Sequence, residues 1–317
     1  MKHPVYDFFI PHRLPKTLFS HLRGLRAPVI KWLIVTLTQA SGAHYNLEYH
    51  WSPIMLDNNT LDDLKQQTVF ILREAKARFK NIGILWSGGK DSTAILALCR
   101  EAFFNTVPFP VIHIDNGIDF PETYAFRDAL VKEWGLHLLV AKSKIAADKI
   151  SGVMCCGMNK TEALRTLMKK EHMDALIVSI RRDEHGVRAK ERVFSPRNGK
   201  WQWNYKDQPA EIWGHTSNDV RADHYRIHPI LHWREIDVWD YILEENIPVN
   251  SLYFAKNGKR FRSLGCTRCT VATDSDASSV TEVLEELGDT TAAERAGRAQ
   301  DKEAQFVMER LRALGYM

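Results

Sequence analysis

The chain has 317 residues, of which 44% are hydrophobic and 26% are charged, and its formal net charge is +4. This composition is typical of a soluble globular protein with ample material for a core. Five cysteines in so long a chain exclude a disulfide-stapled scaffold and favour a reducing compartment, which we expect to be the cytoplasm.

The excess positive charge lies in an N-terminal extension, which we assign to residues 1–59. Residues 1–32 alone hold six Lys and Arg residues and one Asp. Such an arm could bind phosphate backbones or an acidic partner, and a solvated charged face is the alternative. The apolar run at 27–43 is too short to cross a membrane and starts too far from Met1 for a signal peptide, so we expect no membrane association.

From residue 60 onward, helical and strand patterns alternate along the chain. Such alternation predicts an α/β fold with a doubly wound parallel sheet, in a domain spanning 60–225. We expect a C-terminal helical region, 226–317, to complete the active site and the metal site. The predicted helices cover 60–79, 93–104, 121–135, 160–172 and 234–247, and the predicted strands cover 81–87, 109–115, 136–142 and 174–180.

A glycine-rich loop joins the first predicted strand to the helix after it. Two adjacent glycines let the backbone approach an anion closely, and the helix N-terminus adds partial positive charge. A lysine and two serine hydroxyls can complete a phosphate cradle. The spacing differs from the G-x-x-x-x-G-K-[S/T] loop of phosphoryl-transferring ATPases. The loop consists of Ser87, Gly88, Gly89, Lys90, Asp91 and Ser92.

Charged residues also gather where two other predicted strands end. Ligands of open α/β sheets bind at the carboxyl ends of the strands. Asp115 closes the strand at 109–115, where it could bind adenosine or a metal ion. Guanidinium groups suit multi-oxygen anions such as phosphate or sulfate, and a solvated charged loop is the alternative. The basic residues after the strand at 174–180 are Arg181, Arg182, Arg188, Lys190 and Arg192, with Asp183 and Glu184 among them.

The sequence Ser-Gly-Gly-Lys-Asp-Ser after a strand resembles the PP-loop of the ATP pyrophosphatases. These enzymes cleave ATP between the α and β phosphates, transfer AMP to a substrate and hold the departing pyrophosphate in this loop. Over roughly residues 60–317 the chain resembles the small, ATP-binding subunit of bacterial sulfate adenylyltransferase, in a wider family that includes the PAPS and APS reductases. The blocks that carry this resemblance are 109–128, 181–197, 228–242, 261–266 and 290–298.

The resemblance implies that the doubly wound α/β fold is of the adenine nucleotide alpha hydrolase-like kind and that ATP and Mg²⁺ bind at these motifs. Lys90, Arg181 and Arg182 are the expected catalytic residues, which would stabilise charge during in-line attack on the α-phosphorus. Asp91 would order magnesium or phosphate. The expected nucleotide-binding set is Ser87, Gly88, Gly89, Lys90, Asp91, Ser92 and Asp115, with Arg295 and Arg298 closing over the same site.

Four of the five cysteines form a Cys-Cys pair and a distant Cys-x-x-Cys, namely Cys155, Cys156, Cys266 and Cys269. This pattern resembles the ligands of the 4Fe–4S cluster in APS reductases. Structural Zn²⁺ bound by four thiolates, a redox dithiol and unrelated buried thiols are the alternatives. No cysteine follows Cys269, so the C-terminal nucleophile of the sulfonucleotide reductases is missing. Cys99 lies within a predicted helix and is expected in the core.

Two catalytic hypotheses follow, and the first is favoured at this point. In the first, the enzyme adenylates a DNA phosphodiester for phosphorothioation, with a 4Fe–4S cluster and with DNA and a cysteine desulfurase as partners. In the second, it makes adenosine phosphosulfate and pyrophosphate from ATP and sulfate, with a GTPase large subunit as partner. A non-catalytic nucleotide-binding scaffold is the third reading, and a homo-oligomer is compatible with each.

Overall fold

The structure is a computed structural model. No helix in the part of the chain that it describes is long and apolar enough to cross a membrane. The described residues belong to one compact unit within 53–317, and the N-terminal extension predicted at 1–59 lies outside them except for its last two residues. The structure describes residues 58–143, 152–184, 188–204, 208, 211–212, 216–217, 222–290 and 294.

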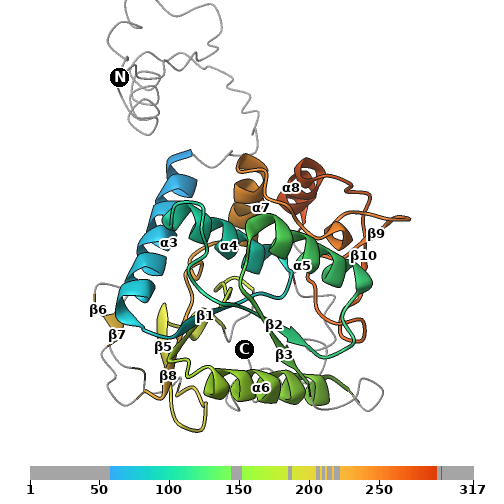
Figure 1. Ribbon diagram of the computed structural model, residues 1–317. Coiled ribbons are helices and arrows are strands. Elements are labelled where there is room, and N and C mark those ends of the chain that lie inside the picture. The colour runs from blue at the N-terminus through green and yellow to red at the C-terminus, as the bar shows by residue number, and fades with distance from the viewer. Residues whose placement is uncertain are drawn as a thin grey trace, which may run out of the picture. The chain divides into compact units, whose positions relative to one another are not determined.

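A six-stranded sheet with the order β3-β2-β1-β4-β8-β5 forms the centre of this unit (Figure 1). The chain moves outward from β1 in one direction and then in the other, which is the doubly wound arrangement that the sequence predicts. Five strands are parallel, and β5 at the edge pairs antiparallel with β8. The strands are β1 (Ile82–Leu85), β2 (Val111–Asp115), β3 (Leu138–Lys142), β4 (Ala175–Ile177), β5 (Phe194–Arg197) and β8 (His224–Ile227).

Helices cover both faces of the sheet. In Figure 1, α3, α4 and α7 lie on one side of the sheet and α6 lies on the other. This placement follows from the connections, because right-handed crossovers put helices on opposite faces when the direction of winding reverses. The helices are α3 (Asn58–Arg78), α4 (Lys90–Ala102), α5 (Pro121–Trp134), α6 (Gly152–Lys170), α7 (Glu235–Glu244) and α8 (Val280–Asp289).

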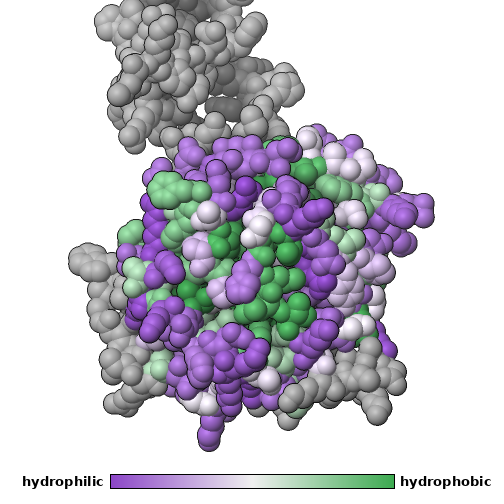
Figure 2. All heavy atoms as spheres, viewed as in Figure 1, coloured by the Kyte–Doolittle hydropathy of each residue, from purple (hydrophilic) through white to green (hydrophobic). Residues whose placement is uncertain are grey.

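The core lies between the sheet and these helices. Ile84, Val111 and Leu176 on the central strands are at most 1% exposed, as expected for parallel strands that are covered on both faces. Cys99 on α4 is fully buried, as predicted, and burial raises the pKa of its thiol. Figure 2 shows hydrophilic residues around the rim of the visible face and hydrophobic residues gathered in its middle.

Several boundaries differ from the sequence prediction for local reasons. Helix α4 begins at Lys90 rather than at residue 93, because Gly89 is its N-cap and the Ser92 and Thr93 hydroxyls donate to the Gly89 carbonyl. Helix α6 begins at Gly152 rather than at residue 160.

The C-terminal part of the chain contains strands as well as the predicted helices. The boundary expected after residue 225 falls inside β8, whose alternating polar residues hid it from the hydrophobic pattern. The remaining short elements are β6 (Glu211–Ile212), β7 (Thr216–Ser217), β9 (Lys259–Arg260), β10 (Thr273–Asp274) and two 3₁₀ turns, η2 (Arg188–Lys190) and η3 (Ser251–Tyr253).

Candidate active site

The glycine-rich loop lies between the carboxyl end of β1 and the N-terminus of α4. Gly88 has a φ of +74°, in the left-handed region that favours glycine. A Cβ atom at Gly88 would also lie only 3.1 Å from Cγ2 of Thr123 on α5. Inside the loop, Ser92 Oγ donates to the Gly89 carbonyl at 3.0 Å and lies 3.3 Å from Ser87 Oγ. The sequence thus folds into a fixed turn that directs backbone N–H groups of α4 toward the end of the sheet.

A residue from the C-terminal part of the chain fastens this loop. Tyr253 in η3 accepts a hydrogen bond of 2.9 Å from the Lys90 backbone N–H through its hydroxyl. Its ring packs edge-on against Trp239 of α7, with 5.4 Å between the ring centroids. Both side chains are buried. The loop is therefore held from outside the α/β core by aromatic residues that sequence analysis did not single out.

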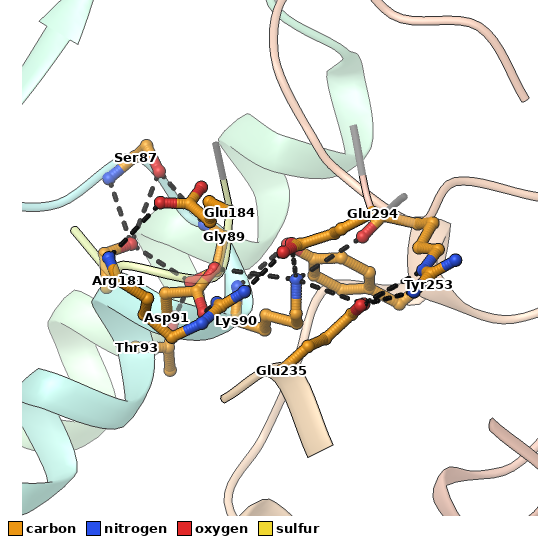
Figure 3. Close-up of polar contacts among 12 residues, drawn as sticks. Ser87, Gly89, Lys90, Asp91, Thr93, Arg181, Glu184, Glu235, Tyr253 and Glu294 are labelled. Atoms are coloured by element: carbon orange, nitrogen blue, oxygen red, sulfur yellow. Dashed lines mark hydrogen bonds and ion pairs between the residues drawn. The ribbon is translucent and has the colours of Figure 1, made fainter. Parts of the chain in front are cut away.

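Two buried cations converge on one carboxylate beside the loop (Figure 3). The side chains of Lys90 and Arg181 are 1% and 0% exposed. Lys90 Nζ donates to Oε1 of Glu294, and Arg181 Nη2 donates to Oε2 of the same side chain. Burial alone would raise the pKa of Glu294, but Arg181 and Lys90 outweigh burial and hold this pKa well below its ordinary value. Glu294 is therefore ionised at neutral pH.

The same two cations contact further carboxylates. Arg181 donates from Nε to Asp183 at 3.0 Å and from Nη1 to Asp91. Lys90 Nζ lies 3.5 Å from Asp91 Oδ2 and 3.8 Å from Glu235 Oε1. The structure thus brings Lys90 and Arg181 together through shared partners, and their ammonium and guanidinium groups face carboxylates.

A cavity of about 170 Å³ opens next to the loop, at the carboxyl ends of β1, β2 and β4. Lys160 and Arg188 are its cations, while Lys90 and Arg181 do not line it. The position agrees with the general rule that open α/β sheets bind ligands where the direction of winding reverses. The polar lining comprises Ser87, Asp91, Ser92, His113, Asp119, Thr123, Lys160, Ser179, Glu184, Arg188, Tyr253 and Ser263.

His113 and Asp119 form the β2 side of this cavity. His113 Nδ1 lies 3.2 Å from the Trp86 carbonyl, so Nδ1 carries the proton of the neutral ring. Its Nε2 has no hydrogen-bond partner among the described residues and lies 3.8 Å from Asp119 Oδ2. Burial lowers the pKa of His113 and raises that of Asp119. Lys160 Nζ is 3.9 Å from Asp119 Oδ1.

The other predicted site residues are placed differently. Asp115 does not line the cavity, because its Oδ1 accepts hydrogen bonds of 2.8 Å from the Gly117 N–H and the Tyr124 hydroxyl. Arg182 contacts His232 Nδ1 at 3.0 Å and is also absent from the cavity lining. Arg295 and Arg298 lie outside the described residues.

Sequence analysis missed Glu294, although it stands directly before Arg295 in a motif that was noticed. It also missed Asp119, four residues after Asp115 in the same loop. Each of them lies close in the sequence to a residue that had been selected for its charge, and this closeness was the signal that could have revealed it.

The Cys-x-x-Cys turn lies against the wall of the cavity. Cys266 Sγ and Cys269 Sγ are 3.1 Å apart, and both residues are buried. The Thr267 backbone N–H donates to the Ile118 carbonyl at 2.9 Å, which fixes the turn to the loop after β2. Cys155 and Cys156 lie in α6, but their side chains are outside the described part. Within the described part, no three His, Cys, Asp or Glu side chains are grouped to hold a metal ion. The four-cysteine ligand set stays a prediction.

Comparison with known proteins places the chain in a family. Residues 81–272 match the phosphoadenosine phosphosulfate reductase domain. The chain belongs to this family. It is 36% identical over 307 residues to sulfate adenylyltransferase subunit 2 of Pseudomonas savastanoi pv. phaseolicola. The alignment covers 83% of this chain and the full length of that relative. The same subunit of Pseudoalteromonas translucida is 35% identical over 293 residues, and this alignment covers 81% of this chain and 98% of that relative.

Solved structures support the fold of this phosphoadenosine phosphosulfate reductase family member. Yeast FAD synthetase in complex with FAD aligns with a TM-score of 0.51 at 19% identity, covering 78% of this chain and 93% of that one. Candida glabrata FMN adenylyltransferase aligns with a TM-score of 0.50 at 18% identity, and this alignment covers 84% of this chain and 91% of that one. The sequence relatives and the PP-loop together identify the chain as an ATP-dependent adenylyltransferase of the ATP pyrophosphatase type.

Proposed function

We propose that this enzyme transfers AMP from ATP to sulfate, forming adenosine phosphosulfate and releasing pyrophosphate. The observation that carries the proposal is the 36% identity along the whole length of relatives named sulfate adenylyltransferase subunit 2. Those relatives support sulfate activation better than the DNA phosphorothioation that the cysteine pattern favoured. The relatives support sulfate as the acceptor, and the geometry of the site supports the proposed position of ATP.

The pyrophosphate part of ATP fits the loop side of the site. Gly89 is the N-cap of α4, so the N-terminus of this helix offers an anion-binding surface with partial positive charge. Lys90 belongs to the first turn, and Arg181 contacts Asp91 in the same turn, so both add positive charge there. Positive charge at this point stabilises the negative charge that builds up on the β-phosphate as the bond to the α-phosphorus breaks.

The AMP part and the acceptor fit the adjoining cavity. Its walls carry Lys160 and Arg188, which suit a tetrahedral oxyanion, and Arg188 is fixed by an ion pair with Glu184. A sulfate oxygen held there attacks the α-phosphorus in line with the departing pyrophosphate. The β2 side, with His113 and Asp119, presents hydrogen-bond acceptors to the nucleoside.

Magnesium fits this arrangement because Asp91 lines the cavity from the first turn of α4, and hard cations prefer carboxylate oxygens. When bound with ATP, Mg²⁺ would neutralise phosphate charge. Asp91 is the residue of the loop that would hold it.

Release of pyrophosphate with and without sulfate tests the proposal. The relatives carry the name subunit 2, so we expect a large subunit as partner, which the family resemblance identifies as a GTPase, and the assay includes it. We expect release to depend on sulfate and to be lost in Lys90→Met. Pyrophosphate release at the same rate with and without sulfate, in the presence of the partner, would contradict the proposal.

The Cys266 and Cys269 thiols favour a second candidate, sulfur incorporation into a DNA phosphodiester. Sulfate activation assigns no role to two buried thiols 3.1 Å apart beside the cavity. The pair supplies two thiolates of the four that a 4Fe–4S cluster or a structural Zn²⁺ site needs, and Cys155 and Cys156 are the proposed remainder. Iron, acid-labile sulfide and zinc, measured per chain on protein purified without oxygen, test this candidate. About four iron and four sulfide support it; zinc or no metal returns the cysteines to a structural role.

A further inference from the structure

Every side-chain nitrogen of Lys90 and Arg181 already contacts a carboxylate in this structure. Arg181 uses Nε for Asp183, Nη1 for Asp91 and Nη2 for Glu294. Lys90 Nζ faces Glu294, Asp91 and Glu235, and it also reaches the Arg262 carbonyl at 3.4 Å. Because both side chains are also buried, pyrophosphate can take these positions beside the two cations only after a carboxylate moves away.

Charge leads to the same conclusion. Apart from Asp183, whose side chain is 34% exposed, the group contains three cations and three carboxylates, so its cations are already neutralised before any ligand binds. Adding the negative charges of a pyrophosphate to a group without excess positive charge is costly where solvent does not screen the repulsion. The members are Lys90, Arg181, Arg262, Asp91, Asp183, Glu235 and Glu294.

Two of these carboxylates, Glu294 and Asp91, contact only Lys90 and Arg181 within the described part of the chain, and Asp91 is fixed in the first turn of α4. Asp183 also accepts a hydrogen bond of 2.7 Å from the Glu235 backbone N–H, and Glu235 also pairs with Arg262 at 2.7 Å. Within the described part of the chain, the hydrogen bonds of Glu294 go to Lys90 and Arg181 alone. Its release would break no other described contact.

The geometry of Glu294 is that of a bound anion. One carboxylate oxygen meets the ammonium group of Lys90 and the other meets the guanidinium group of Arg181 (Figure 3). Two oxygens of a phosphate group could make the same two contacts, because carboxylate and phosphate oxygens are equivalent acceptors for these donors. Pairing with Glu294 also spares two buried cations the cost of remaining without a counter-charge.

We propose that Glu294 is an internal stand-in for phosphate, occupying the anion position between Lys90 and Arg181 until the pyrophosphate part of the nucleotide displaces it. The inference rests on the use of ATP in the proposed function and is independent of the acceptor. It predicts that Glu294 competes with the ligand, so that it lowers the affinity for pyrophosphate and ATP. A residue that only positioned the two cations would raise that affinity.

Calorimetric titration of the full chain with magnesium pyrophosphate tests the inference, and sulfate is left out so that a wrong acceptor cannot affect the result. We expect Glu294→Gln, which keeps the shape and removes the charge, to bind pyrophosphate at least about 10-fold more tightly, a change of about 1.4 kcal/mol. The KM for ATP should fall with it, while kcat changes less. Unchanged or weaker binding overturns the inference.

Two further variants complete the design. Glu286→Gln is the matched control, because Glu286 pairs with Arg260 at 2.8 Å outside the site, and its pyrophosphate affinity should equal that of the wild type. Glu294→Asp keeps the charge but is too short to span both cations, so it should also bind more tightly than the wild type. If Glu294→Gln does not fold, unchanged binding by Glu294→Asp overturns the inference.

Discussion

The hydroxyl of Tyr253 accepts a 2.9 Å hydrogen bond from the backbone N–H of Lys90, although the two residues are 163 positions apart in the sequence. This bond joins the C-terminal part of the chain to the first turn of α4. Because that turn directly follows the glycine-rich loop, the shape of the loop depends on a residue outside the α/β core.

Tyr253→Phe removes this hydrogen bond while keeping the ring that packs on Trp239. We expect the free energy of unfolding to fall by about 1 kcal/mol, because a buried N–H loses its acceptor. Amide hydrogen exchange should become faster in the peptide spanning 84–96 and stay unchanged in α3. Tyr225→Phe, on β8, is the comparison. Equal exchange at 84–96 in all three proteins would show that the bond does not hold the loop.

Gly88 and Gly89 are expected to differ in their tolerance of a side chain. Gly88→Ala places an L-residue at a φ of +74° and a Cβ 3.1 Å from Thr123, so we expect a loss of stability of about 1–2 kcal/mol and weak ATP binding. Gly89 has a φ of −84°, and its new Cβ would meet the Tyr253 hydroxyl at 3.2 Å and Ser87 Oγ at 3.3 Å. Gly89→Ala should therefore retain more stability and more ATP binding than Gly88→Ala. Thermal unfolding and ATP titration of the two variants check the order.

Lys90→Met should lower activity by about 10²–10³-fold, the usual effect of removing one charge-stabilising donor. It also takes one partner from the buried Glu294, for which we expect a loss of about 3 kcal/mol in the free energy of unfolding. The double variant Lys90→Met/Glu294→Gln should regain most of that stability and none of the activity. Full activity in Lys90→Met would refute the role of this lysine.

His224 makes the fold sensitive to acid. Burial and the charges of Arg226, Arg197 and Arg165 lower the pKa of His224 from 6.5 to about 3. Below pH 6.5 the unfolded chain therefore binds a proton that the folded chain does not bind. The contribution of His224 to the free energy of unfolding is fully present above that pH and is lost as the pH drops. The slope should reach about 1.4 kcal/mol per pH unit.

Urea unfolding at pH 7.5 and pH 5 measures this dependence. His224→Gln should show a smaller difference between the two pH values than the wild type, because its side chain does not titrate. His137→Gln, at an exposed position, should behave as the wild type does. Equal pH dependence in all three proteins would contradict the assignment to His224.

The order of strands and helices in the α/β core could be predicted because its signals are local. Strand β1 is apolar throughout, α5 starts with Pro121 and ends at Gly135, and the glycine-rich loop joins two clear elements. Strand β8 could not be found in this way. Its Arg226 is fully buried, and only tertiary structure makes that burial tolerable.

The candidate site was predicted in part, because sequence motifs indicate chemical groups and not their partners. Lys90 and Arg181 were expected to face the nucleotide, yet each is paired with Glu294, a contact that spans 204 positions for Lys90. Asp115 was expected in the site, yet the Tyr124 hydroxyl and the Gly117 N–H use its carboxylate. Such pairings depend on which loops meet at the edge of the sheet, and no spacing in the sequence encodes them.

Formation of adenosine phosphosulfate from ATP and radiolabelled sulfate is the measurement that tests the central claim most directly. The full chain is incubated with the proposed large subunit, Mg²⁺, ATP and labelled sulfate, and the nucleotides are separated. The proposal predicts labelled adenosine phosphosulfate, formed together with pyrophosphate and absent with Lys90→Met. Protein that binds ATP and pyrophosphate but forms no labelled nucleotide would contradict sulfate as the acceptor.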